Sequence, residues 1–349
     1  MADKSSKKVL GVGVVGLGRI SPRHIDDSIK QLKELKLVAV CDVRPNVSEA
    51  VGKKEKVAFY TDYKKLIADP AVDVVAVCVP NGFHFEVGMA VAKKNKHCVM
   101  EKPIAIDYEK AKKLIKAFEK SKGRLFPVLQ VRYNPAVQAL YQAVKNNYLG
   151  KIYSAALIIR WTRPPEYFKG SDWKGTKRLD GGSLMTQAIH YIDVMQYVLG
   201  HAKSVFGKLD QKAHQTETED MANAVIDFES GARGNLEFTI NTYPHNLECS
   251  LTVLGEKGSV KIGGNAVNKI ELWEVENVPS PSIGNGINPD YTGGMYVGSS
   301  PHHQLIYKNL IDVLLYKKPS FIQAKDALES LHIIDGIKKS DKLKKEIKL

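Results

Sequence analysis

The first 130 residues alternate short apolar runs with longer stretches in which charged residues recur. The run 72–79 is almost continuously Val, Ala and Cys, which is typical of a strand covered on both faces. Repeating strand and helix units joined by short loops predict a parallel, doubly wound sheet. The predicted strands are 9–15, 37–41, 72–79, 97–100 and 125–130, and the predicted helices are 23–35, 63–68, 85–94 and 108–121.

The pattern changes after about residue 150. Apolar and polar positions alternate over 153–161 and over several later runs, which predicts a mostly antiparallel sheet with one solvated face. We therefore expect two α/β domains, 1–130 and 131–349. In the second domain the predicted strands are 153–161, 222–229, 232–243, 247–255 and 269–275, and the predicted helices are 184–199, 302–316 and 324–339. The stretch 276–300 is predicted as a long loop, and loops of this length are usually functional or mobile.

The composition is that of an ordinary globular protein, with 44% hydrophobic and 26% charged residues. Its charge is less ordinary, because 51 Lys and Arg oppose 38 Asp and Glu, a formal net charge of +13. A nucleic acid, an anionic surface or an anionic small molecule would suit such a charge. However, 42 of the 51 basic residues are lysine, and no nucleic-acid-binding motif is present. We expect no nucleic-acid partner, and a lysine-rich surface explains the excess equally well.

The cysteines predict neither disulfides nor a metal site. Cys41, Cys78, Cys98 and Cys249 lie in apolar runs and form no CxxC pair. A reducing cytoplasm fits this usage. No run of about 18 apolar residues is present, so we expect no membrane span.

A glycine-rich turn follows the first predicted strand, with the sequence Gly16-Leu17-Gly18-Arg19-Ile20-Ser21. The first glycine permits a tight turn, and the second lets the backbone approach a pyrophosphate. Asp42 ends the next strand, where a carboxylate accepts hydrogen bonds from a ribose and repels a 2′-phosphate. The turn therefore predicts NAD rather than NADP, with Arg44 as a nearby residue that would soften this preference. A tight turn without a ligand is the alternative.

Two further turns follow strands at the expected cofactor edge of the sheet. One contains Pro80-Asn81-Gly82-Phe83-His84, and the other is Glu101-Lys102-Pro103. Lys102 would lie beside the nicotinamide, where the cationic ring of oxidised NAD lowers the lysine pKa toward a useful range. Lys102 could then take or relay the proton of a substrate hydroxyl. Pro103 is expected to fix this turn, with a cis bond as one way to do so.

A third stretch begins at Gly181-Gly182 and continues into the predicted helix 184–199. Thr186 and Gln187 are four and three residues before His190, so a helix would place all three on one side. A helical histidine among apolar neighbours is more often a core residue than a catalyst. Here the two glycines and the polar side favour a site. Asp193 could orient the imidazole or cap the neighbouring backbone, and we expect the structural role.

These motifs together resemble the glucose–fructose oxidoreductase and inositol dehydrogenase superfamily over essentially the whole chain. The resemblance implies an N-terminal Rossmann domain, a C-terminal α/β domain with a large, mostly antiparallel sheet, and a homo-oligomer, dimer or tetramer, formed through that sheet. It implies that Lys102 and His190 are catalytic. It also implies cofactor contacts from Gly16, Gly18, Arg19, Ile20, Asp42, Arg44, Pro80, Asn81, His84, Glu101, Lys102, Gln130, Trp173 and Lys174.

A narrower resemblance is to the bacterial UDP-N-acetyl-glucosaminuronic acid 3-dehydrogenases. The segments that carry it are 132–137, 160–164, 172–176 and 241–246. It implies oxidation of the sugar C3 hydroxyl by NAD, in precursor synthesis for a surface polysaccharide. Period-2 alternation places Arg160 opposite Trp161 and Arg163, and an Arg fork suits an acidic substrate. The implied substrate contacts are Lys102, Arg132, Tyr133, Asn134, Trp161, Arg163, Thr186, Gln187 and His190.

Two positions depart from the family pattern. Thr186 stands where the nucleotide-sugar branch has Asn and many other members have Asp, and Ala188 replaces a glycine. Both departures concern the local substrate contacts and leave Lys102 and His190 in place. A dehydrogenase of a free sugar or inositol is one alternative, which keeps the enzyme class and changes the substrate. Another is a non-enzymatic, NAD-binding co-regulator, which would not need both Lys102 and His190.

Overall fold

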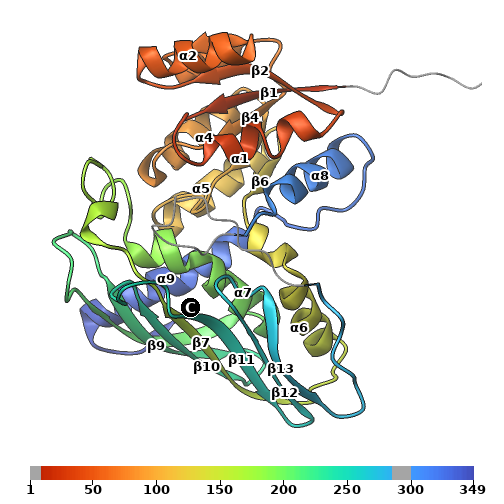
Figure 1. Cartoon of the computed structure of the whole chain (residues 1–349), viewed down its shortest axis with the longest axis vertical. Coiled ribbons are helices and arrows are strands. Elements are labelled where there is room, and N and C mark those ends of the chain that lie inside the picture. Colours follow the sequence, from red (N-terminus) through yellow and green to blue (C-terminus); the bar gives the residue numbers. More distant parts are fainter. Residues whose placement is uncertain (1–8, 285–299) are drawn as a thin grey trace, which may run out of the picture. The chain divides into compact units, whose positions relative to one another are not determined.

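The computed structural model describes residues 9–284 and 300–349, and these residues form two compact units (Figure 1). The first unit contains the described residues up to Val128 together with His303–Asp326, and the second contains the remainder. The predicted boundary at 130 is close to the first break. The segment His303–Asp326 differs from the prediction, because its helix α8 (His303–Leu314) packs against the first unit's helix α1 (Ser21–Ile25).

The first unit is built on a six-stranded, all-parallel sheet in the order β3-β2-β1-β4-β5-β6. Every residue of β1 and β4 is buried, as the continuous apolar runs predicted. The strand order reverses between β1 and β4, and ligands of such sheets bind at the carboxyl ends around this point. The strands are β1 (Leu10–Val15), β2 (Leu35–Cys41), β3 (Ala58–Tyr60), β4 (Val74–Val77), β5 (His97–Met100) and β6 (Leu125–Pro127).

Helices cover this sheet, and one of them was predicted wrongly. Instead of a helix over 23–35, α1 ends at Ile25 and a single 3₁₀ turn covers Ile29–Gln31. The Ser28 hydroxyl donates to the Arg23 carbonyl at 2.7 Å, which takes an acceptor that a continuing helix would use. The other helices are α2 (Pro45–Glu55), which the sequence analysis missed, α3 (Tyr63–Ala68), α4 (His84–Lys93) and α5 (Tyr108–Glu119).

The second unit is built on an eight-stranded sheet in the order β13-β12-β11-β7-β10-β9-β8-β14. Neighbouring strands are antiparallel except β7 and β10. Burial alternates along β9, in agreement with the predicted alternation. The strands are β7 (Ile152–Arg160), β8 (Ala202–Asp210), β9 (Met221–Phe228), β10 (Arg233–Thr239), β11 (Glu248–Gly255), β12 (Gly258–Gly263), β13 (Lys269–Val275) and β14 (Ile347–Lys348).

Helices α6 (Pro135–Lys145) and α7 (Ile189–Leu199) pack against each other and against strands of this sheet (Figure 1). Helix α9 (Asp326–Leu343) ends close to β14. The predicted helix 184–199 begins with a π-helical turn over Leu184–Ala188 before α7 starts. Most of the predicted loop 276–300 falls outside the described residues.

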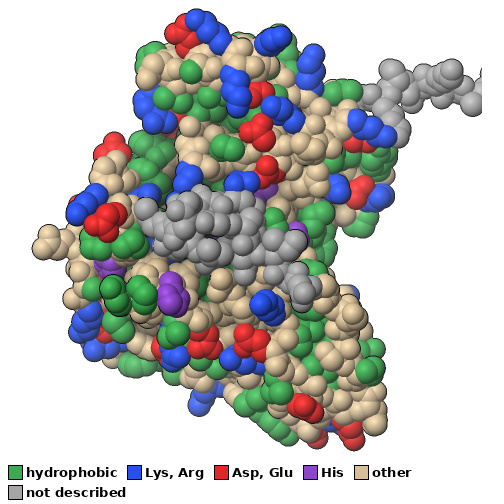
Figure 2. Space-filling view, viewed as in Figure 1, with side chains coloured by type: hydrophobic (Ala, Val, Ile, Leu, Met, Phe, Trp, Pro, Cys, Tyr) green, Lys and Arg blue, Asp and Glu red, His purple; other side chains and the backbone are tan. Residues whose placement is uncertain are grey.

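The surface charge is dispersed. On the face that Figure 2 shows, Lys and Arg side chains are interspersed with Asp and Glu rather than gathered in one patch. All four cysteines are buried as free thiols. Within residues 9–284 and 300–349, no helix combines the length and the apolar character needed to cross a membrane.

Candidate active site

The glycine-rich turn after β1 fits a dinucleotide. Gly16 has a φ of +93°, and an added Cβ would lie 2.5 Å from the Cys78 carbonyl oxygen, so only glycine suits this position. Around Gly18, by contrast, an added Cβ would meet nothing within 4 Å. The backbone at Gly18 and Arg19 is therefore open to a ligand that approaches closely, as a pyrophosphate does. Ile20 completes the turn before α1 begins.

Asp42 lies directly after β2 and is tied to the same turn. Its carboxylate accepts the Leu17 N–H at 3.0 Å and the Arg44 Nε–H at 2.8 Å. Burial acts to raise the pKa of Asp42, but hydrogen bonds from Arg44 and Leu17 outweigh it and hold the pKa below its ordinary value. The carboxylate is thus ionised at neutral pH, as contact with ribose hydroxyls requires.

His84 connects the two turns that follow β4 and β5. Its Nδ1 lies 2.6 Å from the Pro103 carbonyl oxygen, and its Nε2 lies 2.8 Å from that of Val79. Burial lowers the pKa of His84. Both ring nitrogens therefore face the backbone of the turns, while Asn81 is buried beside them and Pro80 precedes it. Cofactor contact by these three residues remains a prediction.

The turn after β5 holds Lys102, and its Lys102–Pro103 peptide bond is cis. Glu101 is buried, and its Oε2 accepts the Lys102 N–H at 3.3 Å. Its other oxygen, Oε1, accepts a hydrogen bond from His24 Nε2 at 3.0 Å. The carboxylate therefore fixes the backbone next to the predicted catalytic lysine from inside the first unit.

His24, His303 and Tyr307 complete this cluster, and none of the three was predicted from the sequence. His303 Nε2 lies 3.4 Å from Glu101 Oε1, and His24 Nδ1 lies 2.7 Å from the Tyr307 hydroxyl. Because the cluster joins residues from three distant segments, no local sequence pattern reveals it. Among the described residues, His24, Glu101 and His303 bring atoms of metal-ligand type within 4.8 Å of one another, and hydrogen bonds hold His24 and Glu101 in this arrangement.

The charges of this cluster are complementary. Burial acts to raise the pKa of Glu101, but hydrogen bonds from His24 and His303 hold it well below the ordinary value. Burial acts to lower the pKa of His24, but Cys78, Tyr307 and Glu101 outweigh it and raise it. Burial lowers the pKa of His303. His24 and Glu101 therefore form a buried ion pair, and His303 beside them is neutral.

His190 lies in the first turn of α7, in the second unit, and is 8% exposed. Gly181 and Gly182 precede it with φ angles of +82° and +111°. The Thr186 hydroxyl donates to the Asp180 carboxylate. Residues 184–188 form a π-helical turn, which is wider than a turn of α-helix. The prediction that Thr186 and His190 lie on one side assumed α-helical spacing, which does not apply to this turn.

Arg163 is the centre of a second group of predicted residues. Gln187 Oε1 accepts from Arg163 Nε at 3.1 Å, and the guanidinium lies 4.9 Å from the Trp161 ring. Gln187 Nε2 donates to the Tyr167 hydroxyl at 2.9 Å. Arg160 instead pairs with Glu237 across the partly exposed side of the sheet, so the predicted opposite orientation of Arg160 and Arg163 is confirmed.

The Arg132 guanidinium forms a two-point ion pair with Asp193, with both N···O distances 2.7 Å. The structural role predicted for Asp193 is compatible with this pairing and stays a prediction. Asn134 Nδ2 donates to the Ala266 carbonyl at 2.7 Å. Lys174 Nζ donates to the Tyr167 carbonyl at 3.0 Å. The ligand contacts predicted for these residues stay predictions, as do those of Gln130, Tyr133 and Trp173, of which Gln130 is buried.

Two domain models of one protein family match consecutive parts of this chain. Residues 10–128 match the NAD-binding Rossmann-fold profile of an oxidoreductase family, and residues 141–349 match the family's C-terminal alpha/beta domain. The chain belongs to this oxidoreductase family. Its predicted family, its α/β fold class and NAD as its cofactor are thereby confirmed, and the non-enzymatic alternative is set aside.

Individual relatives differ in their substrates. The chain is 30% identical over 263 residues to myo-inositol 2-dehydrogenase of Thermotoga maritima, covering 71% of this chain and 74% of that protein. It is 32% identical to the WlbA dehydrogenase of Bordetella pertussis, solved with NADH and UDP-GlcNAcA, with a TM-score of 0.88 and coverage of 98% and 99%. The Chromobacterium violaceum WlbA dehydrogenase, solved with the same ligands, is also 32% identical, with a TM-score of 0.89 and coverage of 99% and 97%.

Proposed function

We propose that this protein oxidises the C3 hydroxyl of a UDP-N-acetyl-hexosaminuronic acid to a ketone, with NAD as oxidant. The observation that carries the proposal is the likeness to two WlbA dehydrogenases solved with NADH and UDP-GlcNAcA, which extends over nearly the whole chain. The buried group of Trp161, Arg163 and Gln187 supports it, because a guanidinium and an amide over an aromatic ring suit an acidic, ring-containing substrate.

A dehydrogenase of a free sugar or inositol is the second candidate. The 30% identity to the Thermotoga maritima inositol dehydrogenase favours it, and this match covers 71% of the chain rather than nearly all of it. The two candidates share cofactor and chemistry and differ in the substrate's nucleotide and carboxylate.

The proposed mechanism assigns roles to residues of both units. Gly16, Gly18 and Asp42 would hold NAD, which supplies a hydride acceptor when bound. We assign the proton of the reacting hydroxyl to Lys102 and His190 together. Lys102 is suited to this role because Glu101 and His84 fix the turn on which it stands. His190 is suited to it because the first turn of a buried helix holds the imidazole rigidly.

The carboxylate and diphosphate of the substrate are assigned to the Arg163 side of the second unit. Arg163, Gln187 and Trp161 form this subsite, and Arg132, Tyr133, Asn134 and Thr186 are its proposed neighbours. We also propose a homo-oligomer through the partly exposed face of the eight-stranded sheet, where Phe206 of β8 and its register partner Val225 of β9 are 50% and 38% exposed.

The experiment is a substrate panel. The purified protein is incubated with NAD and, separately, UDP-GlcNAcA, UDP-GlcNAc, myo-inositol and free sugars. Nicotinamide absorbance reports turnover, and product mass reports the loss of two hydrogens. The proposal predicts turnover of UDP-GlcNAcA, and Lys102→Ala should abolish it. Turnover of inositol or a free sugar without turnover of UDP-GlcNAcA would establish the second candidate instead.

A further inference from the structure

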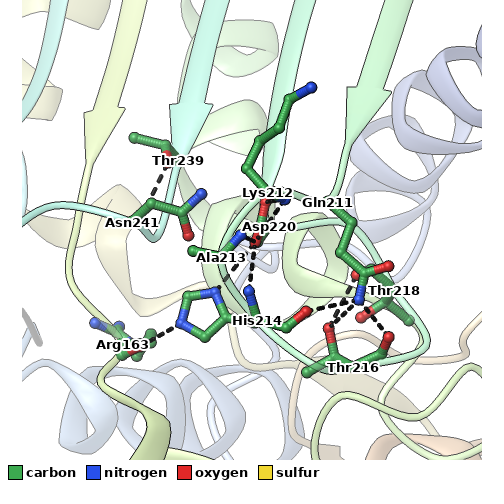
Figure 3. Close-up of polar contacts among 10 residues, drawn as sticks. All are labelled: Arg163, Gln211, Lys212, Ala213, His214, Thr216, Thr218, Asp220, Thr239 and Asn241. Atoms are coloured by element: carbon green, nitrogen blue, oxygen red, sulfur yellow. Dashed lines mark hydrogen bonds and ion pairs between the residues drawn. The ribbon is translucent and has the colours of Figure 1, made fainter.

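The connection between β8 and β9 wraps around one buried carboxylate, that of Asp220 (Figure 3). Asp220 is 0% exposed. Its carboxylate accepts the backbone N–H groups of Lys212, Ala213 and His214 at 2.9, 2.8 and 3.0 Å. Three donors on one carboxylate give the connection a defined shape, although it contains no helix or strand.

His214 links the Asp220 carboxylate to the main chain of Arg163. Its Nδ1 lies 3.2 Å from Asp220 Oδ2, and its Nε2 donates to the Arg163 carbonyl at 2.6 Å (Figure 3). The Arg163 N–H donates in turn to the Ile240 carbonyl at 2.9 Å. Both polar groups of the Arg163 main chain are therefore fixed, so the side chain reaches Gln187 from a defined origin.

Glu219, the residue before Asp220, fixes a different part of the site. Its Oε1 accepts the Leu184 N–H at 2.9 Å, at the start of the π-helical turn that leads to His190. An added Cβ at Gly182 would lie 2.5 Å from the same oxygen, so the glycine is needed for this approach. Lys338 Nζ secures the preceding residue by donating to the Gly181 carbonyl at 2.7 Å.

We propose that Glu219 and Asp220 are positioning residues of the dehydrogenase: Glu219 sets the start of the segment that carries Thr186, Gln187 and His190, and Asp220 acts through His214 to set Arg163. Neither acid touches the substrate in this account. The proposal rests on the proposed function, because it takes Arg163 and His190 as site residues.

The two residues should have different kinetic signatures. Displacement of His190 affects a group assigned to the chemical step, so loss of Glu219 should lower kcat. Displacement of Arg163 affects a group assigned to binding, so loss of Asp220 or His214 should raise the sugar KM. The NAD-binding turn belongs to the other unit, and the KM for NAD should not change.

The test uses the full chain, NAD and whichever sugar the wild type oxidises in the substrate panel, so a wrong substrate assignment does not affect it. Glu219→Ala should lower kcat by up to about 100-fold, the cost of misplacing a reacting group by about 1 Å, whereas Glu219→Gln keeps an acceptor oxygen and should recover most of it. His214→Phe should raise the sugar KM by about tenfold, and His214→Gln, which keeps an N–H donor, should recover part of this loss. Asp220→Asn should raise the same KM.

Lys212→Ala is the matched control, because its side chain is exposed and only its backbone N–H bonds to Asp220. It should leave both constants unchanged. Melting temperatures identify variants that fold poorly, and the Gln variants keep the test decisive if the Ala or Phe variants do not fold. The proposal is overturned if Gln recovers nothing that Ala or Phe lost, or if every variant changes kcat, the sugar KM and the KM for NAD in proportion to its loss of melting temperature.

Discussion

His24 Nε2 donates to Glu101 Oε1 at 3.0 Å, and both side chains are buried. This contact joins the helix after the glycine-rich turn to the turn that carries Lys102. It therefore connects the predicted cofactor-binding and catalytic parts of the first unit through one ion pair.

Removal of His24 should destabilise the protein. His24→Asn leaves the Glu101 carboxylate buried without its cationic partner, which costs about 3–5 kcal/mol in comparable pairs. Tyr307→Phe is the comparison, because it removes one hydroxyl at 2.7 Å from His24 but keeps the ion pair, and it should cost less, about 1–3 kcal/mol. Urea unfolding gives the free energy of unfolding of both variants. An equal loss in the two would show that the His24–Glu101 ion pair stabilises the protein no more than the contact with the Tyr307 hydroxyl does.

The same pair predicts a pH dependence of stability. The pKa of Glu101 is lowered in the folded protein, so its contribution is present above the ordinary value of about 4.5 and is lost as the pH falls through the lowered pKa. The pKa of His24 is raised, so its contribution is complete below about 6.5 and is lost as the pH rises toward the raised pKa.

The pair should therefore contribute fully between about pH 4.5 and 6.5 and less on either side. The free energy of unfolding of the wild type and of Glu101→Gln, measured from well below pH 4.5 to well above pH 6.5, tests the window. A difference between the two proteins that does not vary with pH would contradict the ion-pair assignment.

Much of the fold followed from local patterns. The apolar run 72–79 predicted a buried central strand, and the glycine spacing at Gly16 and Gly18 predicted the turn that follows β1. Both patterns are produced by neighbours in sequence. The predicted helix 23–35 was wrong, and the reason is also local. The Ser28 hydroxyl donates to a backbone carbonyl that a continuing helix would use, and the apolar pattern does not reveal this contact.

The site was harder to predict, because its supporting contacts are long-range. His303 and Tyr307 reach Glu101 and His24 from α8, and Glu219 reaches Leu184 from another connection. The spacing of residues along the chain does not reveal such long-range pairs. The π-helical turn at 184–188 likewise has no apolar periodicity of its own, so an ordinary helix was the natural prediction.

The two glycines of the first turn should respond differently to alanine. Gly16→Ala places a Cβ in a left-handed conformation and against the Cys78 carbonyl, so it should destabilise the fold by at least the roughly 1–2 kcal/mol of that strain. Gly18→Ala meets nothing within 4 Å, so the melting temperature should be unchanged while NADH affinity falls. Fluorescence titration with NADH checks this, and wild-type affinity in Gly18→Ala would mean that the cofactor does not approach this backbone.

Arg163→Lys should weaken binding of an acidic nucleotide sugar. The ammonium cannot reproduce the fork that reaches Gln187, and the sugar KM should rise by about tenfold, or about 1.4 kcal/mol. Arg160→Lys is the control, because Arg160 pairs with Glu237 on the opposite side of the strand and is expected to leave the KM unchanged. Equal KM values in the two variants would remove Arg163 from the substrate site.

The hydrogen at C3 of the sugar gives the most direct test of the proposed oxidation by NAD. UDP-GlcNAcA that carries deuterium at C3 is incubated with the protein and NAD, and the reduced cofactor and the sugar are analysed by mass spectrometry. We expect the deuterium to appear in the reduced nicotinamide and the sugar to become a 3-ketone without it. Deuterium retained in an oxidised sugar, or no reaction while inositol or a free sugar reduces NAD, would contradict the account.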